Sequence, residues 1–329
     1  MSCPTVDLAE KLGRRYLTIR EKRLANVLKV QDEIISSIRA FLKSEGFTEI
    51  LAPIIGPVTD PGIRGAKQVT IDYYGVPFKV MSSMILYKQM IITALPKVFA
   101  LSPNIRLEPL ETLKTRRHLT EFRQVDLEVA YATCEDVMDL GEKMLCQVIA
   151  DVKAKCRKEL GERCKALKVP KRPFKRYTYR EALEVLESMG IKVRYGEEIP
   201  WEAEEAISKA HSEPFWITNY PATARSFYYM ESEENPGILE DFDLIYPEGF
   251  GEAISGGQRE HRYERLVERM KRSGEDPSQY GWYLDMLKAG IPPSAGFGIG
   301  VERLTRFICG LENIWDAVPF PKVAGIPSP

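Results

Sequence analysis

The sequence predicts an α+β domain in which helices flank an antiparallel sheet. Most strand-like segments are joined by hairpin-like loops, and the helix-like segments are grouped around them rather than alternating with single strands. With 329 residues, of which 44% are hydrophobic, the chain is long enough to bury a sizeable core. We expect a single domain over residues 1–329, with a mainly helical insertion at about 150–212 between two sheet-forming halves.

The helices are predicted from apolar residues at helical spacing and from capping signals. Apolar residues recur with a helical period over 20–45, and this period ends at a glycine. Thr133 with Asp136, and Thr178 with Glu181, each match a capping box, so a helix is expected to begin at each site. Further helices are expected at 84–94, 261–272 and 278–288.

The strands are predicted from short apolar or alternating runs that end in turn residues. They are expected at 47–53, 98–102, 104–108, 121–132, 215–218, 226–230, 241–247 and 251–260, and a glycine-rich strand from 294 leads into a last helix. The strand at 121–132 places Gln124, Asp126 and Glu128 on one face, because side chains alternate along a strand. A polar face is ordinarily a solvent face. Here it begins beside an arginine-rich loop, which favours a cleft.

Composition excludes several classes of protein. Net charge is −1, from 46 Lys+Arg against 47 Asp+Glu, so no overall basic field attracts nucleic acid. No run of about 18 apolar residues predicts a membrane span, and the N-terminus lacks the layout of a signal peptide. We therefore expect a cytoplasmic protein. The six cysteines form no Cys-x-x-Cys pair and there are three histidines, so reduced thiols are expected rather than a zinc site.

One segment is locally basic. Residues 153–176 contain eleven lysines and arginines but two acidic residues. Such a stretch could contact RNA. We favour a solvated helix and linker, because aromatic residues are not interleaved with the charges until Phe174 and Tyr177. The sequence leaves both interpretations open.

Several motifs carry the functional signal through their order along the chain. They are NIRLE (104–108), a loop with RRHLTEF (116–122), VDLE (125–128), GEAISGGQR (251–259) and GFGIGVERL (296–304). Together they resemble the class II aminoacyl-tRNA synthetases, most closely the catalytic core of the aspartyl and asparaginyl enzymes. RYLTIR (15–20) and GFTEILAP (46–53) are similar to the opening of that core and to its dimer-forming first motif. The resemblance covers roughly residues 15–329, except the insertion, and implies a class II synthetase-like catalytic domain and a homodimer.

The resemblance implies an ATP site. Arg106 would contact the α-phosphate and the attacking carboxylate, Glu108 would border the adenine, and Phe122 would stack on it. His118 would lie near the distal phosphates, and Arg303 would bind the γ-phosphate. Such spread cationic contacts suit the charge that develops on a transferred phosphoryl group.

The resemblance also implies a magnesium site. Asp243 and Glu252 would supply carboxylate oxygens, which are hard ligands for a hard cation. The expected cofactors are therefore ATP and Mg²⁺. The spacing of the two residues is two longer than the family pattern, which puts Asp243 in doubt.

The amino-acid pocket is expected to contain Ser83, Lys88, Asp126 and Arg259. We name Lys88 and Arg259, with Arg106, as the candidate catalytic residues. A lysine and an arginine that converge in a pocket suit a carboxylate, because either cation buried without a partner would be costly. This reasoning predicts aspartate rather than asparagine as the substrate.

Two departures from the synthetase pattern favour a different reaction. About 14 residues precede RYLTIR, where these synthetases carry an anticodon-binding domain. Ile85 replaces a glutamine that helps hold the substrate α-ammonium group. Both departures resemble the archaeal-type asparagine synthetases related to asparaginyl-tRNA synthetase. They imply ATP-dependent formation of β-aspartyl-AMP and pyrophosphate, followed by displacement of AMP by ammonia.

Aspartate and ammonia would then be the substrates of an AMP-forming ligase, and no tRNA would be needed. The alternative is an aspartyl- or asparaginyl-tRNA synthetase-like core that acts on or binds tRNA. The basic stretch 153–176 is the best support for that alternative.

Overall fold

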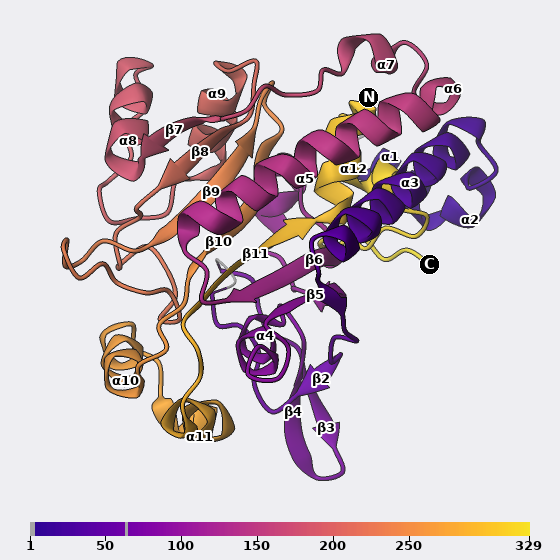
Figure 1. Cartoon of the computed structure of the whole chain (residues 1–329). Helices are drawn as coiled ribbons and strands as arrows, with labels where there is room; N and C mark the ends of the chain where they lie inside the picture. The colour runs from indigo at the N-terminus through magenta and orange to yellow at the C-terminus, as the bar shows by residue number, and fades with distance from the viewer. Residues whose placement is uncertain (1–3, 63–64) are drawn as a thin grey trace.

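The main architectural element is an eight-stranded sheet. The computed structural model describes residues 4–62 and 65–329 (Figure 1). The strand order is β1-β5-β6-β11-β10-β9-β8-β7. The pairs β1–β5 and β7–β8 are parallel and the others are antiparallel, so the predicted α+β class is confirmed. The strands are β1 (Thr48–Glu49), β5 (Lys97–Ile105), β6 (Glu121–Ala130), β7 (Lys175–Thr178), β8 (Phe215–Thr218), β9 (Asp241–Tyr246), β10 (Gly251–Gln258) and β11 (Ser294–Gly300).

Helices pack against this sheet in two groups. Helices α3 (Lys22–Ser44), α5 (Cys134–Lys155) and α12 (Val301–Cys309) cover one face, where their apolar residues join those of the strands in the largest core cluster (Figure 1). Helices α4 (Ile85–Ile91), α10 (Tyr263–Arg272) and α11 (Gly281–Ala289) contribute to a second cluster. Of this second group, α4 packs against β5 and β6 of the sheet.

The remaining elements lie around this body. A smaller sheet has the order β2-β4-β3 and consists of β2 (Ile55–Gly56), β3 (Thr70–Tyr73) and β4 (Val76–Val80). Its β3–β4 hairpin projects from the body (Figure 1). The short helices are α1 (Pro4–Gly13), α2 (Arg15–Thr18), α6 (Arg157–Leu160), α7 (Arg163–Ala166), α8 (Tyr179–Ser188) and α9 (Trp201–Lys209), with 3₁₀ turns η1 (Leu110–Thr115), η2 (Pro277–Tyr280) and η3 (Ile314–Ala317).

Strand β6 shows how the sheet separates core from site. Val125 and Leu127 are buried in the cluster under α3 and α5. Gln124 and Asp126 point to the other face, where they line a large cavity. The alternation read from the sequence therefore marks a cleft rather than a solvent face.

Some of the predicted elements are confirmed by the structure, and others differ from it. The capping boxes at Thr133 and Thr178 are present and open α5 and α8. The segment 98–102 and the start of the segment 104–108 form one strand, β5, which ends at Ile105, while the segment 226–230 forms only an isolated bridge between Tyr229 and Arg259. Within the range 150–212, β7 joins the edge of the main sheet, so this segment is not purely helical. The division into one domain and an insertion stays a prediction.

Three bulk expectations concern the surface and the thiols. Every cysteine in the described part of the chain is a free thiol, and Cys3 lies outside the described residues. Among the described helices, none is long and apolar enough to cross a membrane.

Leu51 is 98% exposed beside an apolar groove formed with α4. The expected homodimer, which would use this first-motif surface, stays a prediction.

Candidate active site

A single cavity of about 840 Å³ collects almost all the residues singled out from the sequence. Its lining comes from the polar face of β6, the N-terminal part of α4, the loop around η1, strand β10 and the start of α12. The predicted site residues that line it are Ser83, Lys88, Arg106, Glu108, His118, Phe122, Asp126, Glu252, Arg259 and Arg303. Asp243 is not in the lining.

At one end of the cavity, Arg106 and Phe122 form a stacked pair. The guanidinium carbon of Arg106 lies 5.2 Å from the centre of the Phe122 ring, a cation–π distance. The Arg106 Nε also donates to the carbonyl oxygen of Ser82 at 3.1 Å. These contacts hold a cation over a flat apolar surface, an arrangement that suits a phosphate next to a purine base.

The neighbouring loop is fixed by local hydrogen bonds and by the C-terminal segment. Within it, Thr115 Oγ1 and His118 Nδ1 lie 2.5 Å apart. The carbonyl oxygen of Arg116 accepts from the Ile314 N–H at 2.9 Å, and Leu119 is buried in a cluster with Trp315. The loop that carries Glu108 and His118 is therefore anchored from both sides.

Arg303 and Glu252 face each other across the same end. Arg303 Nη1 lies 3.2 Å from Glu252 Oε1. Magnesium in nucleotide sites is commonly held by one or two carboxylates together with substrate phosphates, so Glu252 fits the role of a single protein ligand. No cluster of three or more metal-ligating side chains occurs among the described residues.

The structure does not support Asp243 as a second ligand. Asp243 is 3% exposed and bonds through Oδ2 to Arg225, a cavity-lining residue whose side chain is 4% exposed. Arg225 also lies 3.2 Å from Glu198 and 3.4 Å from Asp241. Since Asp243 is part of this buried ion-pair cluster and lies outside the cavity lining, we remove it from the candidate ligand set.

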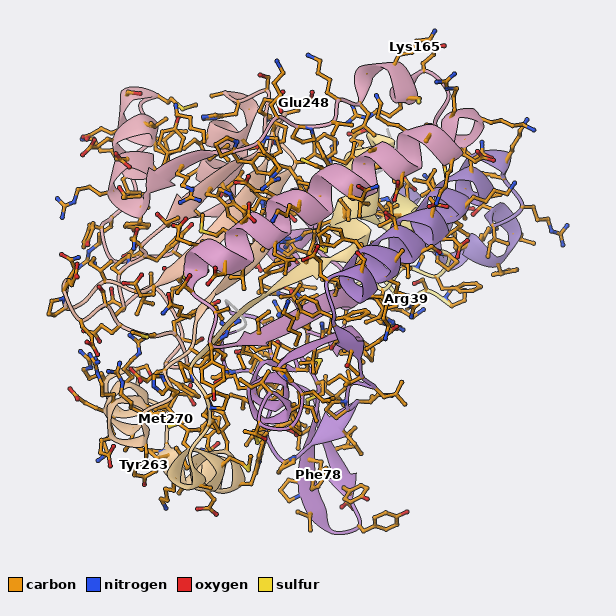
Figure 2. All side chains as sticks on the ribbon, viewed as in Figure 1. Arg39, Phe78, Lys165, Glu248, Tyr263 and Met270 are labelled. Atoms are coloured by element: carbon orange, nitrogen blue, oxygen red, sulfur yellow. The ribbon has the colours of Figure 1, made fainter. Side chains whose placement is uncertain are left out.

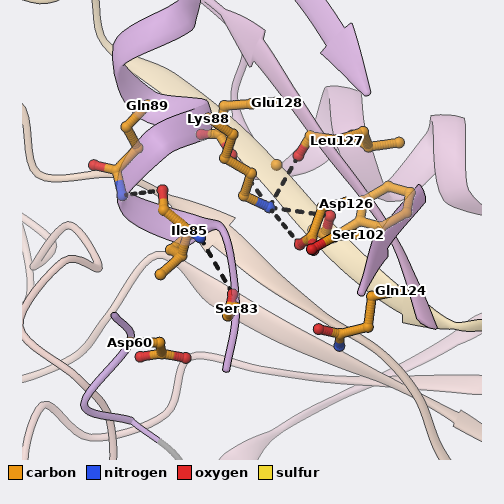
Figure 3. Close-up of polar contacts among 12 residues, drawn as sticks. Asp60, Ser83, Ile85, Lys88, Gln89, Ser102, Gln124, Asp126, Leu127 and Glu128 are labelled. Atoms are coloured by element: carbon orange, nitrogen blue, oxygen red, sulfur yellow. Dashed lines mark hydrogen bonds and ion pairs between the residues drawn. The ribbon is translucent and has the colours of Figure 1, made fainter. Parts of the chain in front are cut away.

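At the inner end, Lys88 is bound by the protein itself (Figure 3). Its Nζ lies 3.3 Å from Asp126 Oδ1, 3.1 Å from the carbonyl oxygen of Leu127 and 3.2 Å from that of Phe297. Glu128 Oε2 is 3.6 Å away. Burial lowers the pKa of Lys88 and raises that of Asp126, and the attraction between the two charges opposes both shifts.

Arg259 is compensated in a similar way. Its Nε donates to Glu128 Oε1 at 3.1 Å, and its Nη2 donates to the carbonyl oxygen of Gly296 at 2.7 Å. A Cβ on Gly296 would overlap the Glu128 carboxylate and the backbone of Leu127. This glycine of the GFGIG run is therefore needed so that β11 can pass close to the ion pair.

These contacts correct the charge argument made from the sequence. Lys88 and Arg259 were expected to be uncompensated cations that need a substrate carboxylate. In the structure Asp126 and Glu128 already balance them. The sequence pattern could not show this balance, because the pairing depends on the arrangement of α4, β6 and β10.

Two polar atoms in this part of the cavity wall still lack a partner. Within the described part of the chain, Asp126 Oδ2 and Arg259 Nη1 are buried and make no hydrogen bond. Both residues line the cavity. A buried acceptor and a buried donor left unsatisfied are costly, so they mark where a ligand with one donor and one acceptor would be stabilised.

Sequence reasoning missed some of the lining. Asp60 is 4% exposed, and its Oδ1 accepts from Gly62 N at 2.8 Å and from the Tyr228 hydroxyl at 3.0 Å. Both Asp60 and Tyr228 line the cavity. The Asp-Pro-Gly sequence signals a turn, but nothing in it points to the cavity. Ser83, which was predicted, lines the cavity, and its Oγ accepts from the Ile85 N–H at 3.2 Å.

Glu302, next to Arg303, gives a pH-dependent prediction. Burial raises its pKa to about 7, although both carboxylate oxygens accept from the Arg123 N–H at 3.0 Å. The folded chain therefore keeps this proton where the unfolded chain loses it, so its contribution to stability falls as pH rises from about 4.5 to about 7.

Glu302→Gln is expected to remove that fall. Between pH 5 and pH 8 the unfolding free energy of the variant should rise relative to the unmodified chain by about 2–3 kcal/mol. Urea unfolding at both pH values measures this difference, and Glu234→Gln at an exposed position is the control. An equal pH dependence in Glu302→Gln and the unmodified chain would contradict it.

The fold is an α+β core built on a mostly antiparallel sheet, with one large cavity beside it. The model of the family "tRNA synthetases class II (D, K and N)" matches residues 7–324. The chain belongs to this family.

Individual relatives support the same family assignment. An asparagine–tRNA ligase of Thermoplasma acidophilum is 33% identical over 323 residues, which are 97% of this chain and 74% of that protein. An aspartate–tRNA(Asp/Asn) ligase of Methanopyrus kandleri is 36% identical over 319 residues, 96% of this chain and 72% of that protein. The crystal structure of asparaginyl-tRNA synthetase from Pyrococcus horikoshii complexed with asparaginyl-adenylate superposes with a TM-score of 0.90 at 31% identity, covering 100% of this chain and 74% of that one.

These findings overturn two expectations. The predicted synthesis of asparagine from aspartate and ammonia is contradicted, because the relatives are named as tRNA ligases. The expectation that tRNA is not a partner is contradicted by the same names. The ammonia route was inferred from the two departures at the N-terminal side and at Ile85. Its orientation of the substrate assumed that Lys88 and Arg259 hold the α-carboxylate, and the structure shows both paired within the protein.

Proposed function

We propose that the chain activates asparagine with ATP and transfers the asparaginyl group to tRNA. The observation that carries this proposal is one cavity whose lining includes both the candidate phosphate-binding residues and two unsatisfied polar atoms. Arg106, Phe122, Glu252 and Arg303 line this cavity, and so do Asp126 and Arg259, each of which has a buried atom without a hydrogen bond. A nucleotide and an amino acid bound in this one cavity would be held next to each other for reaction.

At the nucleotide end, the side chains would act by binding and charge compensation. Phe122 would stack on the adenine, Arg106 would contact the α-phosphate, and Arg303 and His118 would contact the distal phosphates. Glu252 would hold Mg²⁺ together with phosphate oxygens. The ion, when bound, supplies compensation for the negative charge of the phosphates.

The reaction would proceed in two displacements. A carboxylate oxygen of the amino acid attacks the α-phosphorus, a C–O–P bond forms, and the bond to the pyrophosphate leaving group breaks. Arg106 stabilises the charge that develops on the α-phosphate oxygens. A ribose hydroxyl at the 3′ end of tRNA then attacks the carbonyl carbon, gives up its proton, and AMP leaves.

Charge and hydrogen bonding favour asparagine over aspartate. Lys88 and Arg259 are already balanced by Asp126 and Glu128, and Asp60 adds a further buried carboxylate. A second substrate carboxylate would therefore enter without a compensating cation, which is costly in a buried site. A carboxamide carries one acceptor and one donor group, and so matches the unsatisfied Arg259 Nη1 and Asp126 Oδ2.

Pyrophosphate exchange into ATP tests the activation step. We expect exchange that depends on asparagine and Mg²⁺, with aspartate much poorer at equal concentration. Exchange with aspartate alone would contradict the assignment of the side-chain pocket and leave the class of reaction intact. Absence of exchange with both amino acids would contradict the proposed function.

Several lysines and arginines of the basic stretch 153–176 are paired in the structure. Lys155 bonds to Glu33, Arg176 bonds to Glu135, and Arg172 bonds to Asp139. Lys153 donates inward to backbone carbonyls. Lys165, on α7, extends into solvent (Figure 2) and lies 3.0 Å from Glu162. Since acidic residues and carbonyls already bind these cations, the segment resembles a solvated linker more than an RNA surface.

Reversing Lys165, Lys168 and Lys171 to glutamate is therefore expected to leave exchange and tRNA charging within a few-fold of the unmodified chain. Initial charging rates at 50 mM and 200 mM salt measure the effect. Loss of charging together with a weaker salt dependence would contradict this expectation, because phosphate contacts make binding to nucleic acid fall steeply with salt.

A further inference from the structure

A carboxylate on α9 lies behind the nucleotide end of the cavity. Glu204 belongs to the segment 150–212, has a 5% exposed side chain and does not line the cavity. We propose that Glu204 is a positioning residue for ATP binding, which holds Arg117 and the backbone of Glu252 in place. This inference rests on the proposed function, since it presumes that ATP binds at this end.

Glu204 accepts hydrogen bonds from two elements that border the nucleotide end. Arg117 donates to it through both terminal nitrogens, from Nη1 to Oε1 and, at 3.2 Å, from Nη2 to Oε2. The backbone N–H of Glu252 also donates to Oε1. A bidentate arginine pair is geometrically specific. One carboxylate therefore links the loop after η1 to the start of strand β10.

The neighbours of these donors are candidate phosphate ligands. Arg117 directly precedes His118, and Glu252 pairs with Arg303. His118, Glu252 and Arg303 come from different elements and line the same cavity. Their relative positions depend on a shared support, and Glu204 contacts two of the three elements directly.

Gly251 shows that the chain makes room for this contact. Its φ is +75°, a conformation that L side chains rarely adopt. A Cβ there would overlap Arg117 Nη1 and lie 2.6 Å from Glu204 Oε1. The residue before Glu252 must therefore be a glycine if the loop, α9 and β10 are to meet at one carboxylate.

A second residue on the same face of α9 also holds the turn between β9 and β10. Ser208, four residues after Glu204 and so on the same side of the helix, donates to the carbonyl oxygen of Tyr246 at 2.6 Å. Its Oγ also accepts from the N–H groups of Gly249 at 2.9 Å and Gly251 at 3.3 Å. Ser208 thus secures the turn, while Glu204 adds the link to the loop and carries the charge.

The charge matters because several arginines converge here. Burial, together with the nearby Arg117 and Arg303, lowers the pKa of Arg306 to about 10. Arg117 is itself 7% exposed. Without Glu204, Arg117 would lose the bidentate acceptor that compensates its charge, and the loop that carries His118 would lose this link to β10.

The experiment compares Glu204→Gln with Glu205→Gln by pyrophosphate exchange. Glu205 is the adjacent residue, pairs with Lys209 and is partly exposed, so its variant should behave like the unmodified chain. In Glu204→Gln we expect the KM for ATP to rise about tenfold or more while the KM for asparagine is unchanged. A purely structural role would instead lower the melting temperature and the activity without this separation of the two KM values.

Arg117→Lys provides a second test if Glu204→Gln does not fold. It keeps the charge but loses the bidentate geometry, and the KM for ATP should rise selectively here too. Unchanged KM values in a folded variant, or equal changes in both, would overturn the inference while exchange by the unmodified chain still supported the proposed function. Absence of exchange by the unmodified chain would overturn both.

Discussion

Replacing Arg303 by alanine is expected to raise the KM for ATP roughly 10- to 100-fold and to leave the KM for asparagine nearly unchanged. Arg303 lines the nucleotide end and lies 3.2 Å from Glu252. A charge-assisted contact to a phosphate contributes about 1.5–3 kcal/mol, which corresponds to this range. Pyrophosphate exchange at varied ATP concentration gives the value.

The control for Arg303→Ala is Arg194→Ala. Arg194 has an 84% exposed side chain and a single weak ion pair with Glu197, so its removal should not affect either KM. If Arg303→Ala bound ATP as tightly as the unmodified chain, the assignment of the α12 motif to the phosphates would be wrong.

Replacing Arg259 by methionine is expected to have two large effects. Glu128, with no exposed surface, would lose its main partner. Removing one member of a buried pair costs about 3–5 kcal/mol of unfolding free energy. Amino-acid activation would also be lost, because Nη1 is the donor proposed for the substrate. Urea unfolding and pyrophosphate exchange measure the two effects.

The double variant Arg259→Met with Glu128→Gln separates them. Since it removes the unpaired buried charge, much of the lost stability should return. Activation should stay absent, because the donor is still missing. A stable double variant that activates asparagine with an unchanged KM would contradict the substrate role of Arg259.

The sequence predicted the site best where the functional residues belong to a single strand or loop. The alternation in β6 placed Gln124 and Asp126 on a cleft, and the ordered motifs brought Arg106, Phe122 and Arg303 into one cavity. Local period and motif order carry this information, because they do not depend on how distant elements pack.

The pairing of buried cations with carboxylates and carbonyls could not be predicted from the sequence pattern. Whether Lys88 is free depends on its distance to Asp126 on β6 and to backbone carbonyls on β6 and β11. Asp243 was expected to bind a metal, and only the fold shows Arg225 against it. The wrong reaction was inferred from two departures from the family pattern, before RYLTIR and at Ile85. The substrate orientation proposed with it treated Lys88 and Arg259 as free cations, which the structure shows paired.

Charging of tRNA tests the central claim most directly. The chain, with ATP, Mg²⁺ and radiolabelled asparagine, is incubated with tRNA transcripts, and the acid-stable label on the RNA is counted. We predict label that depends on ATP, on asparagine and on an intact 3′ end. Formation of free asparagine from aspartate and ammonia, with no label transferred to tRNA, would contradict the account.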